Sequence, residues 1–107
     1  MTEAASVSAG ADGRVRVAGL LDVHTVADCR DEGLPFFEDA GDPLVFDLSE
    51  SDPRGSAAIA LLIAWQREAK RRDARISIVG ASERLLEIAD ACGVREILPF
   101  DESAAPA

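Results

Sequence analysis

The sequence predicts a single α/β domain built on a mixed sheet. Two short, almost wholly apolar runs, 44–48 and 76–79, have the composition of parallel strands that are covered on both faces. Helical patterns at 56–72 and 82–92 alternate with these runs, which is typical of parallel strands joined by helices. An alternating polar and apolar stretch over 14–20 follows a turn signal at 11–13 and indicates an opening β-hairpin at one edge.

The first half of the chain supplies the hairpin and one interrupted helix. Residues 7–10 pair with 14–20 in the expected hairpin, and a helix is expected from about Val26. Asp22 and Thr25 are both candidate N-caps of this helix. Gly33 and Pro35 predict a break or a kink before the helix ends. Its apolar positions are Val26, Cys29, Phe36 and Phe37.

The second half supplies two further strands, two helices and a last short strand. Turn-forming residues predict turns at 41–43 and a loop over 49–55, after the strand 44–48. Ser56 is expected to cap the helix to Arg72, and Ser82 to cap the helix through Cys92, which Gly93 terminates. A short strand at 97–98 would close the fold. We expect residues 7–100 to form the domain, with flexible ends at 1–6 and 101–107.

The charge of the chain disfavours several classes of partner. The formal net charge is -9, from 11 basic and 20 acidic residues, so nucleic acid and anionic membrane surfaces are repelled. Residues 1–53 hold 12 acids and 3 bases, whereas 54–107 hold 8 of each. The excess acid therefore lies in the first half, which favours a basic protein surface as its partner.

No segment has the pattern of a membrane span or an export signal. The longest apolar run is 57–65, far shorter than the roughly 18 residues that a span needs. Residues 1–6 lack a basic and then apolar leader. Cys29 and Cys92 are far apart and outside metal or redox spacings, which fits a reducing compartment. We expect a cytoplasmic protein with no direct membrane insertion.

No catalytic, cofactor or metal motif is present. The phosphate-loop, dinucleotide-binding, zinc-protease and nucleophile-elbow patterns are all missing. A triad of Ser56, His24 and Asp47 can be drawn, but no motif supports it. A response-regulator receiver is disfavoured because no Lys follows 97–98. We therefore expect no enzyme activity, no cofactor and no metal.

The start of the long helix is the most informative stretch. Ser56 lies where free backbone N–H groups and the helix dipole favour an oxygen acceptor or a phosphate. An ordinary N-cap explains the same serine. Residues 57–65 are apolar around the whole circumference of the helix, so either other helices flank it or part of it is a docking surface.

These features resemble a STAS domain, the SpoIIAA-like fold of anti-sigma factor antagonists. The segment 19–22 (GLLD) resembles the family's GELD segment, and 44–49 (LVFDLS) resembles its central strand. The segment 55–62 (GSAAIALL) aligns with the family's D-S-[SA]-G-L-x-x-L helix start, with Gly55 in place of its Asp and Ala58 in place of its Gly. The resemblance places Ser56 on the family's phosphorylatable Ser/Thr.

Within the family, segments 61–69 and 88–99 look most like the MlaB-type proteins. Those are cytoplasmic accessory subunits of the phospholipid ABC transporter that maintains outer-membrane lipid asymmetry. The resemblance implies a non-enzymatic subunit that binds the transporter's ATPase, and so lies at the inner membrane through the complex. The alternative is an anti-sigma factor antagonist switched by phosphorylation of Ser56, with an anti-sigma factor kinase as partner. The expected partner interface is Ser56 with Arg54, Gly55, Ala57, Ile59, Ala60 and Ile63.

Overall fold

The elements follow one another in the order expected of a hairpin and then alternating helices and strands. A computed structural model describes residues 5–10, 12–38 and 43–101. Two strands open the chain, β1 (Ser6–Ala9) and β2 (Val15–Leu21), and α1 (Val26–Gly33) follows. The remaining elements are β3 (Leu44–Pro53), α2 (Ala57–Arg71), β4 (Ile76–Val79) and α3 (Glu83–Ala91).

The four strands form one mixed sheet in the order β1-β2-β3-β4. β1 is antiparallel to β2, which confirms the predicted hairpin, and β2, β3 and β4 are parallel. The register of β2 against β3 shifts between Arg16 and Ala18, so the sheet is irregular at that point. Of the predicted turns, residues 11, 41 and 42 lie outside the described residues.

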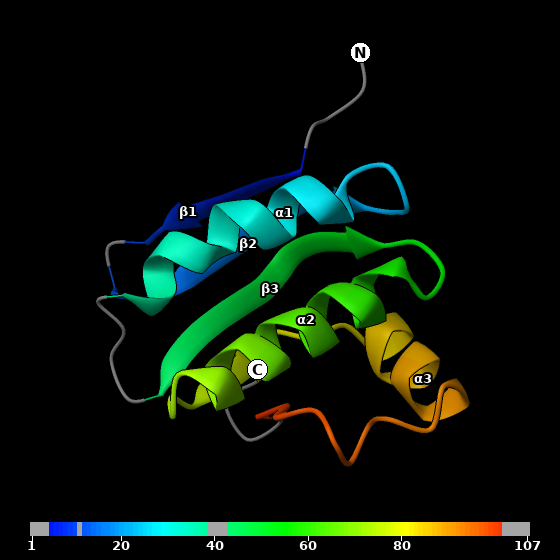
Figure 1. Ribbon diagram of the computed structural model, residues 1–107. Coiled ribbons are helices and arrows are strands. Elements are labelled where there is room, and N and C mark those ends of the chain that lie inside the picture. Colours follow the sequence, from blue (N-terminus) through cyan, green and yellow to red (C-terminus); the bar gives the residue numbers. More distant parts are fainter. Residues whose placement is uncertain (1–4, 11, 39–42, 102–107) are drawn as a thin grey trace.

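Helices α1 and α2 lie side by side across one face of the sheet and run in the same direction (Figure 1). α3 lies along the other side of α2. The core forms where these helices meet the sheet, because alternate strand side chains point toward them. The members with no more than about 2% of their surface exposed are Val15, Val17, Leu21, Cys29, Phe46, Leu48, Ala58, Leu61, Leu62, Trp65, Ala69, Ile78, Leu85 and Ala89.

Trp65 fastens α1 to α2 and to the central strand. Its ring stacks on Phe46 with centroids 4.2 Å apart, and its Nε1 donates to the Arg30 carbonyl at 3.3 Å. A Cβ at Gly33 would lie 2.6 Å from the Trp65 Nε1, so only glycine fits there. Gly33 is the last residue of α1. The predicted break follows it and is a 3-10 helix at Leu34–Phe37.

The structure corrects three predictions about strands. β3 continues to Pro53 where a loop was expected over 49–55, because residues 50–53 pair with β2. Residues 97–98 are in turns, and the last pairing is a single parallel bridge between Ile78 and Phe100. The run 44–48 was expected to be buried on both faces, yet Val45 and Asp47 are partly exposed, since the helices cover only the other face.

Within the described residues, no helix combines the length and the apolar character needed to cross a bilayer.

Candidate functional site

The candidate site is the connection between β3 and α2, at the end of the sheet where β2 also ends (Figure 1). The Arg54 N–H donates to the Leu21 carbonyl at 2.9 Å and so ties the exits of the two strands together. Gly55 follows in the left-handed region with φ 63°, which glycine adopts at no steric cost. This turn brings the chain directly into α2, with Ser56 as the residue before its first turn.

The Ser56 hydroxyl is not a helix cap, which corrects the prediction from sequence. Its backbone is already helical, with φ -85° and ψ 0°, and the side chain makes no capping hydrogen bond. An N-cap side chain typically reaches the backbone N–H groups of the next residues from an extended backbone. Ser56 is exposed, and its hydroxyl makes no hydrogen bond to any residue that the structure describes. The side chain is therefore open to a kinase or to a partner.

Charged groups flank Ser56 on its strand side. Arg54 donates to Asp52 Oδ2 from Nε at 3.1 Å and from the terminal nitrogen at 2.9 Å. These hydrogen bonds lower the pKa of Asp52, with the charges of Arg54 and Arg84 acting in the same direction. Asp22 contributes a further carboxylate near Arg54. A phosphate on Ser56 would therefore enter a region that holds both arginines and carboxylates, at a helix end whose dipole favours negative charge.

The structure divides the predicted interface residues into an exposed and a buried set. Arg54, Gly55, Ser56 and Ala60 are exposed, and Ile63 is partly exposed. Ala57 and Ile59 point into the core, with 8% and 3% of their surface exposed. The buried pair supports the helix from below, so a partner at this end would touch the exposed set.

The apolar circumference of the first half of α2 is explained mainly by its neighbours. α1 and α3 flank α2 on its two sides, and most of the apolar side chains contact them or the sheet. The first of the two alternatives, flanking helices, accounts for the buried positions. Ala60 is exposed over this half of the helix, and Ile63 and Ala64 are partly exposed.

The triad of Ser56, His24 and Asp47 does not assemble. Asp47 lies in the middle of β3, six residues before its end, which is roughly 20 Å of extended chain. Its carboxylate accepts the Ser49 N–H at 2.9 Å. Partial burial acts to raise the pKa of Asp47, but the hydrogen bonds from Ser49 and the charges of Arg16 and Arg14 outweigh it and lower that pKa.

Among the described residues, no group of three or more His, Cys, Asp and Glu side chains could hold a metal ion.

The loop from β2 to α1 is a neighbour of Ser56 that the sequence did not indicate as part of the site. The predicted cap Thr25 is used within this loop: its hydroxyl donates to the Leu20 carbonyl at 2.7 Å and accepts from the Asp22 N–H at 3.0 Å. Asp22 accepts the His24 N–H at 2.8 Å instead of capping the helix. Val23, held at the tip, has 76% of its surface exposed. In the sequence, the one sign that this loop belongs to the site is an apolar residue, Val23, between the polar residues Asp22 and His24.

Comparison with known proteins assigns the family. The model of a family described as "Mlab, STAS domain" matches residues 4–99. The chain belongs to this STAS-domain family. Anti-sigma-B factor antagonists of Staphylococcus epidermidis, one of them from strain ATCC 12228, are 24% identical over 88 residues, which is 82% of each chain. A solved structure of the unphosphorylated anti-sigma factor antagonist SpoIIAA matches 97% of this chain and 89% of its own, with a TM-score of 0.68 and 16% identity.

These matches confirm the predicted STAS fold with its mixed sheet. The SpoIIAA structure supports the fold alone at this identity, while the curated relatives carry antagonist names over most of their length. The expectation of an MlaB-type transporter subunit rests on the family description only. The antagonist alternative is thus the better supported of the two functions.

Proposed function

We propose that this STAS domain is an anti-sigma factor antagonist, a binding protein without chemistry of its own, and that phosphorylation of Ser56 controls its binding. One observation carries the proposal: Ser56 is exposed, uncapped and free of hydrogen bonds to the described residues, although it stands at the start of a helix. The hydroxyl is therefore available to a kinase, because it is not engaged in stabilising the helix.

The antagonist names of the curated relatives support this function. The partner is then an anti-sigma factor with kinase activity, which binds the unmodified serine and transfers a phosphate to it. The phosphate adds a charge of roughly -1.5 to -2 at pH 7. At an interface this charge must lose its hydration, so phosphorylation releases the partner.

The deciding experiment is phosphorylation in vitro with the anti-sigma factor kinase of the same genome and ATP, followed by mapping of the modified residue. We expect one phosphate, on Ser56, and none on the Ser56→Ala variant. Phosphate on another residue, or unchanged phosphorylation of Ser56→Ala, would show that Ser56 is not the phosphorylated switch.

A binding experiment tests the same switch without the kinase reaction. Ser56→Glu should leave the free domain folded, because a carboxylate suits a helix N-terminus, and should weaken the complex at least about tenfold. Ser56→Thr should bind as the native chain does. The matched control is Ser8→Glu, which adds the same charge on the exposed edge strand β1 and should leave binding unchanged. Equal binding by both Glu variants would contradict a contact at Ser56.

A second function, an accessory subunit of a phospholipid transporter, is favoured by the description of the matching family. In that case Ser56 and the exposed residues around it contact the ATPase subunit, and the protein lies in the cytoplasm against the inner membrane through the complex. Co-expression with the ATPase subunit and, separately, with the anti-sigma factor distinguishes the two functions. Recovery of a stoichiometric complex with the ATPase alone would replace the antagonist function.

A further inference from the structure

A shallow apolar groove runs between α1 and α2. Its volume is about 140 Å³, and it is lined by Val26, Ala27, Arg30, Ala60, Leu61 and Ala64. A cavity of roughly this volume holds one benzene-sized group in a well-studied lysozyme variant. The groove therefore has room for one large apolar side chain.

The groove stays open because its walls carry alanines. Ala27 on α1 and Ala60 on α2 are both exposed, and Ala64 is partly exposed one turn after Ala60. Beneath them Trp65 fills the space between α1 and the sheet, so the two helices cannot move closer together. Covering these apolar walls would be favourable, since they are now in contact with water.

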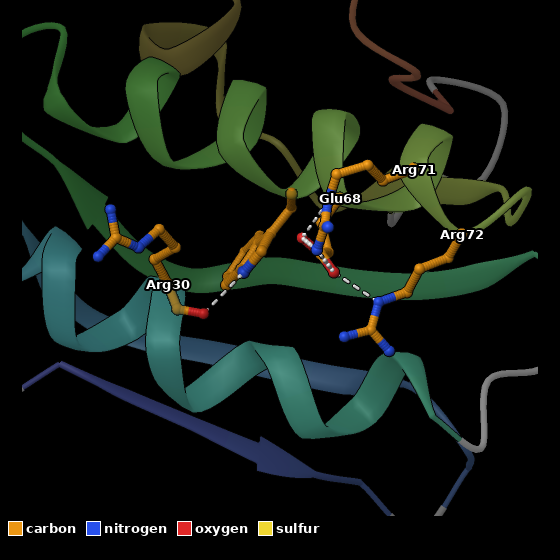
Figure 2. Close-up of polar contacts among 5 residues, drawn as sticks. Arg30, Glu68, Arg71 and Arg72 are labelled. Carbon is orange, nitrogen blue, oxygen red and sulfur yellow. Dashed lines mark hydrogen bonds and ion pairs between the residues drawn. The ribbon is translucent and has the colours of Figure 1, made fainter.

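Arginine side chains lie along the same boundary between the two helices. Arg30 lines the groove, and Figure 2 shows it with Arg71 and Arg72 between α1 and α2. Arg67 is exposed one turn beyond Ala64 and has no ion-pair partner among the residues described.

The nearby carboxylates only partly balance these charges. Glu68 is shared by Arg71 and Arg72, and Asp31 pairs with Arg30 at 3.3 Å. Asp28 and Glu32 are the other exposed acids of α1, and helical geometry places both on nearly the opposite side of α1 from Arg30. A chain of net charge -9 thus keeps a locally basic strip beside an apolar groove.

We propose that the α1–α2 groove binds an acidic amphipathic segment of a partner protein. One leucine or phenylalanine of the segment fills the groove, and carboxylates on its flanks pair with Arg30 and Arg67. Complementary charge of this kind mainly provides specificity and faster association. An anionic membrane fits less well, because an extended surface would also meet the acids of the rest of the molecule. This surface adjoins the Ser56 end, with which it shares Ala60, and does not depend on the proposed antagonist function.

The test is a titration of the ¹⁵N-labelled full chain, followed by NMR, with a synthetic helical peptide that has one central leucine flanked by glutamates. We expect saturable shifts of the amides of Ala27, Ala60 and Ala64. A peptide with lysine in place of each glutamate should cause none, and one with alanine in place of the leucine should bind about tenfold more weakly. No saturable shift, or equal binding of the lysine peptide, would overturn the proposal.

Two variants with matched controls locate the contact. Ala60→Leu fills the groove and should raise the Kd of the peptide about tenfold, whereas Ala91→Leu, at the exposed end of α3, should not change it. Arg67→Gln should raise the Kd a few-fold and reduce its salt dependence, and Arg84→Gln on α3 should do neither. Trp65 fluorescence checks the fold of each variant. Unchanged binding by both groove variants, or binding to phosphatidylglycerol vesicles but not to the peptide, would overturn the proposal.

Discussion

The starts of α2 and α3 look alike in sequence and differ in structure. Both helices follow a parallel strand, a glycine with positive φ and a serine at the N-cap position. Ser82 has an extended backbone, with ψ 160°, and its hydroxyl accepts the Leu85 N–H at 3.1 Å. Ser56 has ψ 0° and makes no such bond. The serine of α3 therefore stabilises its helix, and the serine of α2 is left for another molecule.

The two preceding glycines differ in the same way. A Cβ at Gly80 would lie 2.8 Å from Asp47 Oδ1 and 2.8 Å from the Ser49 backbone nitrogen, whereas a Cβ at Gly55 would meet nothing within 4 Å. The turn before α3 is thus packed against the central strand, whereas the turn before α2 faces open space at Gly55. The tightly packed turn at Gly80 serves the fold, whereas the open turn at Gly55 is accessible to a partner.

The largest difference should come from the glycines. Gly80→Ala combines an unfavourable φ of 71° with a clash against backbone, so we expect a loss of about 2–4 kcal/mol of unfolding free energy. Gly55→Ala has only the φ of 63° to overcome and should lose about 1 kcal/mol. Urea denaturation followed by Trp65 fluorescence measures both. Equal losses would show that the two starts are packed alike.

The serines should give the next largest difference. Ser82→Ala removes a capping bond and should lower the unfolding free energy by about 1 kcal/mol. Ser56→Ala removes no bond and should change it by less than about 0.5 kcal/mol. The same denaturation series compares the two variants. If Ser56→Ala costs as much as Ser82→Ala, Ser56 is a cap in solution and its availability to a kinase is in question.

The smallest effect should be a pH dependence on the α3 side. The pKa of Asp47, the carboxylate beside Gly80, is lowered by the fold, so its ionised form stabilises the folded state. That stability is fully present above the unfolded pKa of about 3.9 and is lost as the pH falls through the lower folded value. The native chain should therefore lose stability below about pH 4 more steeply than Asp47→Asn. Denaturant titrations across this pH range measure both proteins. If their unfolding free energies fall with pH in parallel, Asp47 does not contribute to the loss of stability in acid.

Most of the fold was predictable because its signals are local. The apolar run 76–79 gives β4 with its bounds unchanged, and the long helix begins and ends within one residue of the expected 56–72. The turn-forming residues at 49–53 predicted a loop, but this segment is strand. Its hydrogen bonds to the neighbouring strand β2 outweigh the local preference of its residues for turns. Residues 97–98 lacked such a partner and remained in turns.

The candidate site was predictable as a position but not as a geometry. Ser56 follows from its place before an apolar helix and from the resemblance of 55–62 to the family's motif. Whether its hydroxyl caps the helix depends on a single ψ angle, which the preceding turn through Gly55 sets. The groove between α1 and α2 depends on how Trp65 spaces two helices far apart in the sequence. No local pattern contains that information.

The same tryptophan gives the molecule a built-in optical probe. Trp65 is the chain's single tryptophan, it is fully buried, and its indole N–H donates to a carbonyl of α1. Its emission therefore reports whether α1 remains docked, and it does so from below the groove and away from the Ser56 loop. Unfolding of the domain changes the surroundings of the indole, whereas a ligand at either surface can bind while they stay the same. A variant that no longer binds but keeps the native Trp65 emission has therefore lost its contact with the partner and not its fold.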